Sequence, residues 1–178
     1  MKIVTFAVGA AHVAASVQLR ASLLALDPPA EINVVQGCVD LGRREALKYK
    51  PRVIFDELVT APQDDVVLWL DADCVVRGPL PVLPDGAEIS GYSPTLDYWV
   101  DGVLLVRNCK ATRALMGAWR DKLDLDVWEA TDVELSRLIL EMQIAVVDLA
   151  PEDCWRESWG MKERYGNRVP RIVVTEVA

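Results

Sequence analysis

The sequence lacks the usual signs of a zinc site, a disulfide framework or a membrane span. It contains one histidine and four cysteines, and no two cysteines form a C-x-x-C pair. Widely spaced cysteines argue against both a structural zinc site and a dense set of disulfides. No apolar run approaches the ~20 residues that a transmembrane helix needs. We therefore predict a cytoplasmic protein with reduced cysteines and no transmembrane segment.

The sequence also has fewer positively charged residues than negatively charged ones. Lysine and arginine total 19 residues against 27 aspartates and glutamates, which gives a formal net charge of −8. This balance argues against general binding to nucleic acid or to anionic membranes, so bulk nucleic acid is not expected as a partner. The apolar fraction of 52% and the length of 178 residues suit one globular domain with a sizeable core. We expect a single domain over residues 1–178 and leave its oligomeric state open.

The N-terminal region predicts a strand, a turn and a helix. Lys2–Val8 is an apolar run, Gly9-Ala10-Ala11 suggests a turn, and leucines recur at helical spacing within Val13–Leu26. Asp27-Pro28-Pro29 then ends the helix. The apolar stretch faintly resembles a secretory signal, but the helical pattern continues past any cleavage point. His12 falls in the predicted turn, so we expect it to be a loop residue.

Apolar runs and helical patterns alternate along the rest of the chain. Pro51 predicts that the helix over Arg43–Leu58 has two pieces, since proline is tolerated in the first turn of a restarted helix. The other expected helices are Lys110–Leu123 and Asp132–Met142, and the expected strands are Glu31–Val35, Val66–Leu70, Ile89–Tyr92, Val103–Val106, Ile144–Leu149 and Arg171–Val174. Strands separated by helices predict an α/β fold, with a mostly parallel sheet and helices on both faces.

The most informative segment is Val66–Leu70 with the sequence Asp71-Ala72-Asp73 behind it. Five apolar residues lead directly into two aspartates, which predicts a buried strand that ends at a pair of carboxylates. Ligands of open α/β sheets bind at this end of the strands. Carboxylates at positions i and i+2 of an extended chain point to the same side, where both can contact one divalent cation. A strand followed by a polar turn would need no metal, but the long apolar run favours a functional site.

Several segments, in this order, resemble glycosyltransferases of the nucleotide-diphospho-sugar (GT-A) fold, and family-8-like enzymes in particular. The segments are Lys2–Ala7, Tyr49–Ile54, Leu70–Asp73, Tyr98–Asn108 and Thr131–Leu135. The resemblance reaches from the first strand to about Leu149. It implies a metal-assisted glycosyltransferase that moves a sugar from a nucleoside-diphosphate sugar, most plausibly a UDP-sugar, to an acceptor. The sequence does not identify that glycan, protein or small-molecule acceptor.

The resemblance also implies roles for particular residues. The strand end Thr5-Phe6-Ala7 would hold the nucleotide base, and Lys50 and Arg52 would add positive charge near the phosphates. Asp71, Ala72 and Asp73 would form the D-x-D motif and bind Mn²⁺ or Mg²⁺, which prefer oxygen ligands. The catalytic candidates are Asp132 and Asp101. Asp132 would accept a hydrogen bond from a sugar hydroxyl or act as a general base, although it can equally cap the following helix.

Two features depart from the family pattern. Its third metal ligand is commonly a histidine after the last strand, where this chain has Thr175 and Glu176. We take Glu176 as the candidate third ligand. Asp101 stands where the family tends to have asparagine. Trp155 and Trp159 follow the last predicted helix and belong either to the core or to an apolar wall for a sugar ring.

Two other functions fit parts of the sequence. Asp71-Ala72-Asp73-Cys74-Val75 resembles the first motif of haloacid-dehalogenase-type phosphatases, with Asp71 as nucleophile, and Asp148 and Asp153 as a distal acidic pair. That motif normally lies on an early strand, whereas two predicted helices precede it here. The third possibility is an inactive module that binds a sugar nucleotide or glycan without turnover, because the expected histidine is missing.

Overall fold

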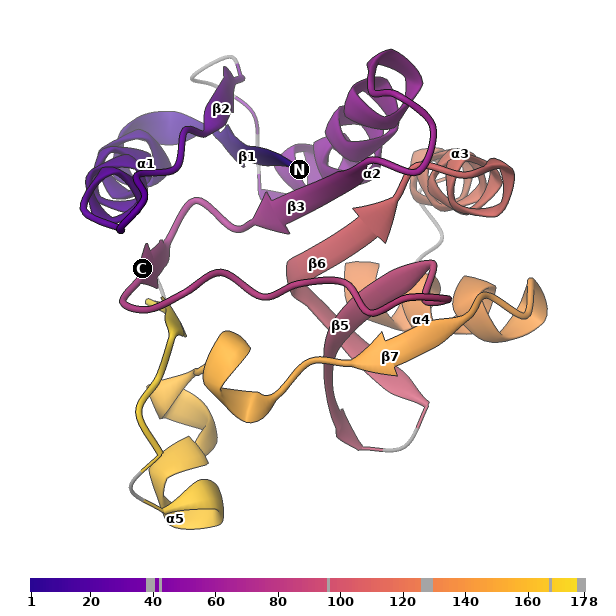
Figure 1. The fold of residues 1–178 in the computed structure, drawn as a ribbon. Helices are drawn as coiled ribbons and strands as arrows, with labels where there is room; N and C mark the ends of the chain where they lie inside the picture. Colours follow the sequence, from indigo (N-terminus) through magenta and orange to yellow (C-terminus); the bar gives the residue numbers. More distant parts are fainter. Residues whose placement is uncertain (38–40, 42, 96, 126–129, 167, 176–178) are drawn as a thin grey trace.

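The computed structural model describes residues 1–37, 41, 43–95, 97–125, 130–166 and 168–175. Helices and strands alternate in the first part of the chain, after which several strands and then two helices follow one another, as Figure 1 shows. The elements are β1 Lys2–Ala7, α1 Gly9–Leu24, β2 Asn33–Gln36, α2 Arg43–Thr60, β3 Val66–Leu70, β4 Cys74–Val76, β5 Ile89–Thr95, β6 Tyr98–Arg107, α3 Lys110–Asp124, α4 Thr131–Glu141, β7 Val146–Asp148, η1 Pro151–Asp153, η2 Glu157–Trp159, α5 Met161–Tyr165 and β8 Ile172–Val174.

Six strands form one sheet in the order β2-β1-β3-β6-β5-β7, and β4 pairs with β8 in a separate ribbon. β2, β1 and β3 are parallel, β6 is antiparallel to both β3 and β5, and β7 is parallel to β5. Only β6 therefore runs against the other five. The predicted mostly parallel α/β sheet is confirmed, and its carboxyl-end edge is the place where a ligand site is expected.

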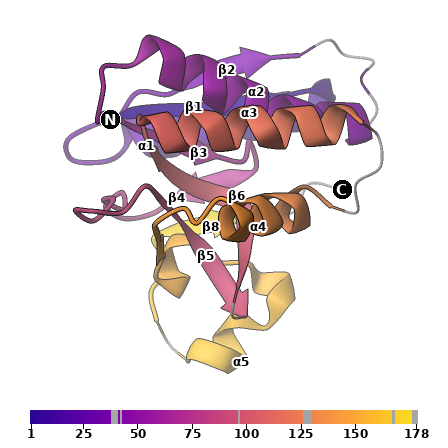
Figure 2. The ribbon, with the colours of Figure 1, turned by 90° about the vertical axis from the view of Figure 1, so that its right-hand side faces the viewer.

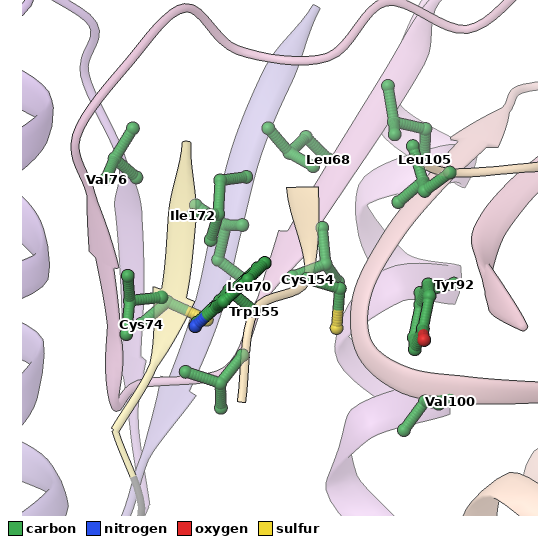
Figure 3. Close-up of a cluster of buried hydrophobic side chains, with 14 of the residues drawn as sticks. Leu68, Leu70, Cys74, Val76, Tyr92, Val100, Leu105, Cys154, Trp155 and Ile172 are labelled. Atoms are coloured by element: carbon green, nitrogen blue, oxygen red, sulfur yellow. The ribbon is translucent and has the colours of Figure 1, made fainter. Parts of the chain in front are cut away.

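Each face of the sheet carries its own core. On one face, α2, α3 and α4 cover a cluster that includes Trp69, Leu104 and Trp119. Figure 2 shows α3 and α4 together on this side. On the other face, α1 and the β4–β8 ribbon cover a second cluster; Figure 3 shows part of it, including Leu70 and Trp155. Trp155 is 4% exposed, so its place is in the core.

Several expected boundaries were wrong in detail. α1 begins at Gly9, immediately after β1, so His12 lies in the helix and not in a loop. Gly9 has φ of +73°, a left-handed conformation that glycine tolerates at such an abrupt strand-to-helix junction. α2 is a single helix with Pro51 inside it. Ala130 occupies the N-cap of α4, so Asp132 sits in the first turn and does not cap it.

β5 and β6 are the elements that most exceed their predicted lengths. β6 extends from Tyr98 to Arg107, whereas the apolar run predicted only Val103–Val106. Aspartate and glycine at positions 101 and 102 interrupt that run, and both positions contribute to the functional site described below. The pairing with β5 shifts register near Tyr92. Such irregularities are common beside functional sites because they redirect side chains.

Trp119 provides a test of the helical layer. Its side chain is fully buried, and its Nε1 donates to the Thr131 carbonyl at the start of α4 (3.0 Å). We expect Trp119→Phe to lower the free energy of unfolding by about 1–3 kcal/mol, because a buried acceptor loses its partner. Urea denaturation would measure this loss. Trp159→Phe, at a more exposed tryptophan, should change stability by less than about 0.5 kcal/mol, and equal losses would contradict the assignment.

Candidate functional site

The site forms where the chain leaves β3. The amide of Asp71 donates to the Gly102 carbonyl on β6 (2.9 Å), and the amide of Cys74 donates to the Asp71 carbonyl (2.9 Å). These bonds close a turn over Ala72 and Asp73. The two aspartates thus lie at the predicted carboxyl end of the strand. The expectation of an extended chain through these residues was wrong, because Ala72 and Asp73 form a turn.

Lys50 of α2 is a buried cation between two carboxylates. Its Nζ lies 2.9 Å from Asp71 Oδ1 and 3.0 Å from Asp101 Oδ1, and it also donates to the Asp101 carbonyl (3.1 Å). Trp69 supports the same arrangement, since its Nε1 donates to Asp71 Oδ1 (2.9 Å) and its ring lies 5.5 Å from the Lys50 ammonium. Burial lowers the pKa of Lys50, but the charges of Asp101 and Asp71 outweigh it and raise the pKa overall. Lys50 therefore stays protonated and fixes both carboxylates.

Asp101 brings an unsatisfied oxygen into the site. Its Oδ1 binds Lys50, whereas its Oδ2 is buried and has no hydrogen-bond partner among the described residues. A buried acceptor without a partner costs free energy, of order 1–3 kcal/mol in mutational data. A hydroxyl group of a bound molecule would satisfy this atom. The site thus contains one buried acceptor that the described residues leave unsatisfied.

Asp73 carries a destabilised negative charge. Burial raises the pKa of its carboxyl, and the nearby Asp71 charge raises it further, to about 6. Arg156 and, more weakly, His12 counter this rise, so both lie within electrostatic reach of Asp73. The Asp73 carbonyl accepts hydrogen bonds from the amide (2.9 Å) and the hydroxyl (2.6 Å) of Thr175. Thr175 therefore stands beside the motif.

The acidic residues present fit a hard divalent cation. Asp71 and Asp73 supply carboxylate oxygens, and the raised pKa of Asp73 indicates that a further positive charge would be favourable there. No cluster of three or more His, Cys, Asp or Glu side chains suited to a metal occurs in the described part of the chain. Mg²⁺ is often held by only one or two carboxylates together with water and substrate phosphates. Glu176, the predicted third ligand, lies outside the described residues.

Tyr98 and Asp132 form a second polar pair beside these groups. The Tyr98 hydroxyl donates to Asp132 Oδ2 (2.5 Å), and the Val133 amide donates to Asp132 Oδ1 (3.0 Å). Burial and the Asp132 carboxylate raise the pKa of Tyr98, with smaller contributions from Asp101 and from Arg156 in the opposite direction. The two catalytic candidates, Asp132 and Asp101, are therefore neighbours of one tyrosine. Both oxygens of Asp132 are oriented by the protein itself.

Arg156, which the sequence did not single out, lies in the middle of the site. Its Nη2 is 3.8 Å from Asp71 Oδ2, and its guanidinium lies 4.8 Å from the centre of the Trp159 ring. Burial lowers the pKa of Arg156, but Asp71 and other negative groups outweigh it and raise the pKa overall. Gly102 leaves room for this side chain, since a Cβ at that position would stand 2.7 Å from Nη2. Only the fold could reveal this contact, because Arg156 is far from Asp71 in sequence.

The other predicted residues that the structure describes have less direct positions. Thr5 is fully buried, and its hydroxyl has no hydrogen-bond partner among the described residues. Phe6 stacks on Tyr49 with ring centres 5.0 Å apart, and Ala7 ends β1. Arg52 points elsewhere, because its Nη2 binds both carboxylate oxygens of Asp124 at the end of α3 (2.7 and 2.8 Å). Lys50, Asp71, Asp73, Asp101 and Asp132 are the predicted residues that the fold groups most closely.

The fold is that of known glycosyltransferases. No family model and no curated protein matches the sequence. The apo-form glycosyltransferase GlyE of Streptococcus pneumoniae TIGR4 aligns with a TM-score of 0.65 at 15% identity, over 97% of this chain and 53% of that one. The galactosyltransferase LgtC, in complex with donor and acceptor sugar analogues, aligns with a TM-score of 0.61 at 15% identity, over 98% and 86% of the two chains.

A third structure covers nearly the whole of both chains. This glycosyltransferase, involved in the glycosylation of the major capsid of PBCV-1, aligns with a TM-score of 0.67 at 11% identity, over 98% of this chain and 93% of that one. The chain thus spans about half of the GlyE chain but most of the other two. The resemblance drawn from the sequence is confirmed for the fold, which is GT-A-like. No helix in the described residues has the length and apolar character needed to cross a membrane.

Removal of the Lys50 charge should destabilise the protein strongly. Lys50→Met leaves Asp71 and Asp101 without the cation that compensates them, which we expect to cost about 3–5 kcal/mol of unfolding free energy at pH 7.5. Chemical denaturation followed by fluorescence would measure the loss. The same substitution at the exposed Lys110 is the control. A Lys50→Met loss no larger than that of the control would show that Lys50 does not hold the site together.

Asp73 should make stability depend on pH. The folded protein raises the pKa of its carboxyl from 3.8 to about 6. Because the unfolded state releases this proton at lower pH, the folded state loses stability as pH rises from 3.8 to about 6. We expect Asp73→Asn to be more stable than the wild type above pH 6 in EDTA, with the difference gone below pH 3.8. Thermal unfolding across pH would measure it, with Asp85→Asn as a control for charge. No gain at pH 8 would contradict the burial argument.

Proposed function

We propose that this protein is a metal-assisted glycosyltransferase that uses a nucleoside-diphosphate sugar as donor. The observation that carries the proposal is the convergence of Asp71, Asp73, Asp101 and Asp132 at the carboxyl end of β3 within a GT-A-like fold. This arrangement combines carboxylates for a cation with hydrogen-bond acceptors for sugar hydroxyls. The solved LgtC complex with donor and acceptor sugar analogues supports such substrates in a related architecture. A UDP-sugar is the first donor to test.

The donor side would use the β3 turn and the end of β1. Asp73 and Asp71 would hold Mn²⁺ or Mg²⁺, which supplies positive charge for the diphosphate leaving group. Thr5, Phe6 and Ala7 would border the nucleotide base, where the buried Thr5 hydroxyl still lacks a partner among the described residues. The small side chain of Ala72 would leave space in the turn for the donor. Lys50 contributes by holding the Asp71 carboxylate in place.

Two predicted residues stand in less direct positions. Arg52 would contact a phosphate only after its two hydrogen bonds to Asp124 break. Glu176 is retained as a proposed metal ligand, although it lies outside the described residues. The proposed donor site does not require either of them, because the other groups already gather at β3.

The sugar side would use Asp101 and Asp132. In transfer, the bond from the anomeric carbon to the diphosphate oxygen breaks and a bond to an acceptor hydroxyl oxygen forms. If the reaction inverts configuration, Asp132 takes the hydroxyl proton as general base, with Tyr98 holding the carboxylate in place. Asp101 Oδ2 would accept a hydrogen bond from a sugar hydroxyl. The acceptor remains a glycan, protein or small molecule of unspecified structure.

The phosphatase alternative is not favoured by the structure. Asp148 accepts a hydrogen bond from the Trp99 indole (2.8 Å), and Asp153 binds Arg171 (2.6 Å). Both proposed distal acids thus have structural partners of their own. In addition, one oxygen of the proposed nucleophile, Asp71 Oδ1, already binds Lys50 and Trp69. The three solved structures described above are all glycosyltransferases.

Metal-dependent nucleotide binding is the direct test of this function. We expect UDP or GDP to bind in calorimetry only when Mn²⁺ is present, and Asp73→Ala to weaken that binding at least about tenfold because a charged ligand is lost. Asp85→Ala is the control for removal of an exposed carboxylate. Slow release of the sugar from the matching nucleotide sugar would then show turnover. Binding without any release would favour an inactive module, and no binding of either nucleotide would contradict the proposed donors.

A further inference from the structure

Helix α1 carries apolar side chains on the side that faces away from the core. Its buried residues are Ser16, Leu19 and Leu23. The exposed stripe of α1 consists of Ala10, Ala14, Val17, Ala21 and Leu24. At 3.6 residues per turn, the centre of this stripe lies roughly 150° around the helix from the buried residues. A surface helix normally has polar residues at such positions, so this face requires an explanation.

The spacing of the exposed stripe is that of a helix that packs against another helix. Its five residues follow one another at intervals of four, three, four and three, which is the a and d pattern of a coiled coil. Val17 and Leu24 are 64% and 50% exposed, whereas α2 and α4 each expose one large apolar side chain, Val59 and Leu140. Single exposed apolar residues are ordinary, but a continuous row marks an interaction surface. In Figure 1, α1 forms the left-hand margin of the molecule, where a second helix has access to it.

The distribution of charge favours a second copy of this chain as the partner. The whole chain has a formal net charge of −8, so two copies repel each other in most orientations. Residues 1–26 contain no aspartate or glutamate, and their ionisable side chains are Lys2, His12 and Arg20. Two copies that meet through α1 therefore bring together the part of each chain that carries no acidic residue.

The size of the side chains in the exposed stripe also favours a helix over a membrane surface. Three of the five residues are alanines, and none is aromatic. Alanine adds little apolar area to a membrane contact, which depends on large apolar side chains. Small residues instead allow two helix backbones to approach closely, as they do where helices pack tightly. The stripe thus has the composition of a close helix–helix contact.

We propose that two copies of this chain associate through α1 in an antiparallel, two-fold arrangement with Val17 at the axis. In such an interface the same surface occupies both sides, and each contact occurs twice. Ala10 then lies against the partner's Leu24, and Ala14 lies against the partner's Ala21. A small residue opposes a large one at each end, and small residues oppose each other beside the centre. The stripe is therefore complementary to itself in this orientation.

The length of α1 limits the strength of this association. A helix of 16 residues is about 24 Å long, so one helix from each copy covers less than the roughly 800 Å² per partner of a standard interface. We therefore expect a reversible dimer with a dissociation constant on the order of 100 μM. The inference goes beyond the proposed transfer reaction, because the exposed stripe contains none of the residues assigned to it.

Sedimentation equilibrium of the full chain between about 10 μM and 1 mM, which brackets that constant, is the test. Val17→Glu should weaken the dimer at least about tenfold, because it buries two like charges at the axis. Val82→Glu is the control, since Val82 is 83% exposed and lies outside α1. It should change the dissociation constant less than about threefold, as expected for an ordinary surface substitution.

Ala14→Leu separates close packing from general apolar attraction. It makes the face more apolar but fills the space that two approaching helices need, so we expect at least about tenfold weaker association. Leucine is a strong helix former, and retained thermal unfolding transitions would show that α1 is intact. Stronger association of Ala14→Leu would contradict the close pairing.

Disulfide formation between copies tests the orientation. Val17→Cys should cross-link to itself under mild oxidation faster than the wild type does. Ala10→Cys should not, because an antiparallel pair separates the two copies of residue 10 by roughly 20 Å along the helices. Equal cross-linking of both variants would overturn the antiparallel arrangement.

Three further results would overturn the inference as a whole. The first is a wild type that stays monomeric over the whole concentration range. The second is a dimer that Val17→Glu leaves as strong as Val82→Glu does, which would place the contact on another face. The third is a monomeric wild type that sediments with vesicles of mixed anionic and zwitterionic phospholipids and loses this binding in Val17→Glu. That result would assign the exposed stripe to a membrane surface.

Discussion

The site depends on the buried ammonium of Lys50. It lies within 3.0 Å of carboxylates from two different strand regions, after β3 and within β6, and it reaches them from a helix on one face of the sheet. Without this cation, Asp71 and Asp101 would repel each other in a partly buried space. The indole of Trp69 adds a hydrogen bond to the same oxygen of Asp71. Electrostatic compensation thus joins three elements at the edge where the sheet can bind a ligand.

Two groups beside this ion pair lack a compensating partner among the described residues, and they define the chemistry of the site. Asp101 retains a buried oxygen without a described partner, and Asp73 carries a carboxyl whose pKa is raised to about 6 by burial and by Asp71. The first suits a hydroxyl donor, and the second suits a cation. Arg156 adds a guanidinium that is fixed by Trp159.

The sequence was sufficient for the features that local patterns control. The apolar run before Asp71 predicted the strand and its end correctly, and the alternation of elements predicted the α/β sheet. It could not predict the turn at Ala72, because a two-residue spacing does not distinguish an extended chain from a turn. Arg156 was missed because its contact with Asp71 exists only after the C-terminal segment folds against the sheet. The family resemblance placed Arg52 near the phosphates together with Lys50, yet positions i and i+2 of a helix face different neighbours, and Arg52 pairs with Asp124.

A crystal structure of the protein with UDP or GDP, whichever binds, and Mn²⁺ would test the central claim most directly. We predict that the diphosphate lies at the carboxyl end of β3, with the manganese anomalous signal beside Asp73. The base should lie near the end of β1. A nucleotide bound at another surface, with Asp71 and Asp73 contacting neither metal nor phosphate, would contradict the account.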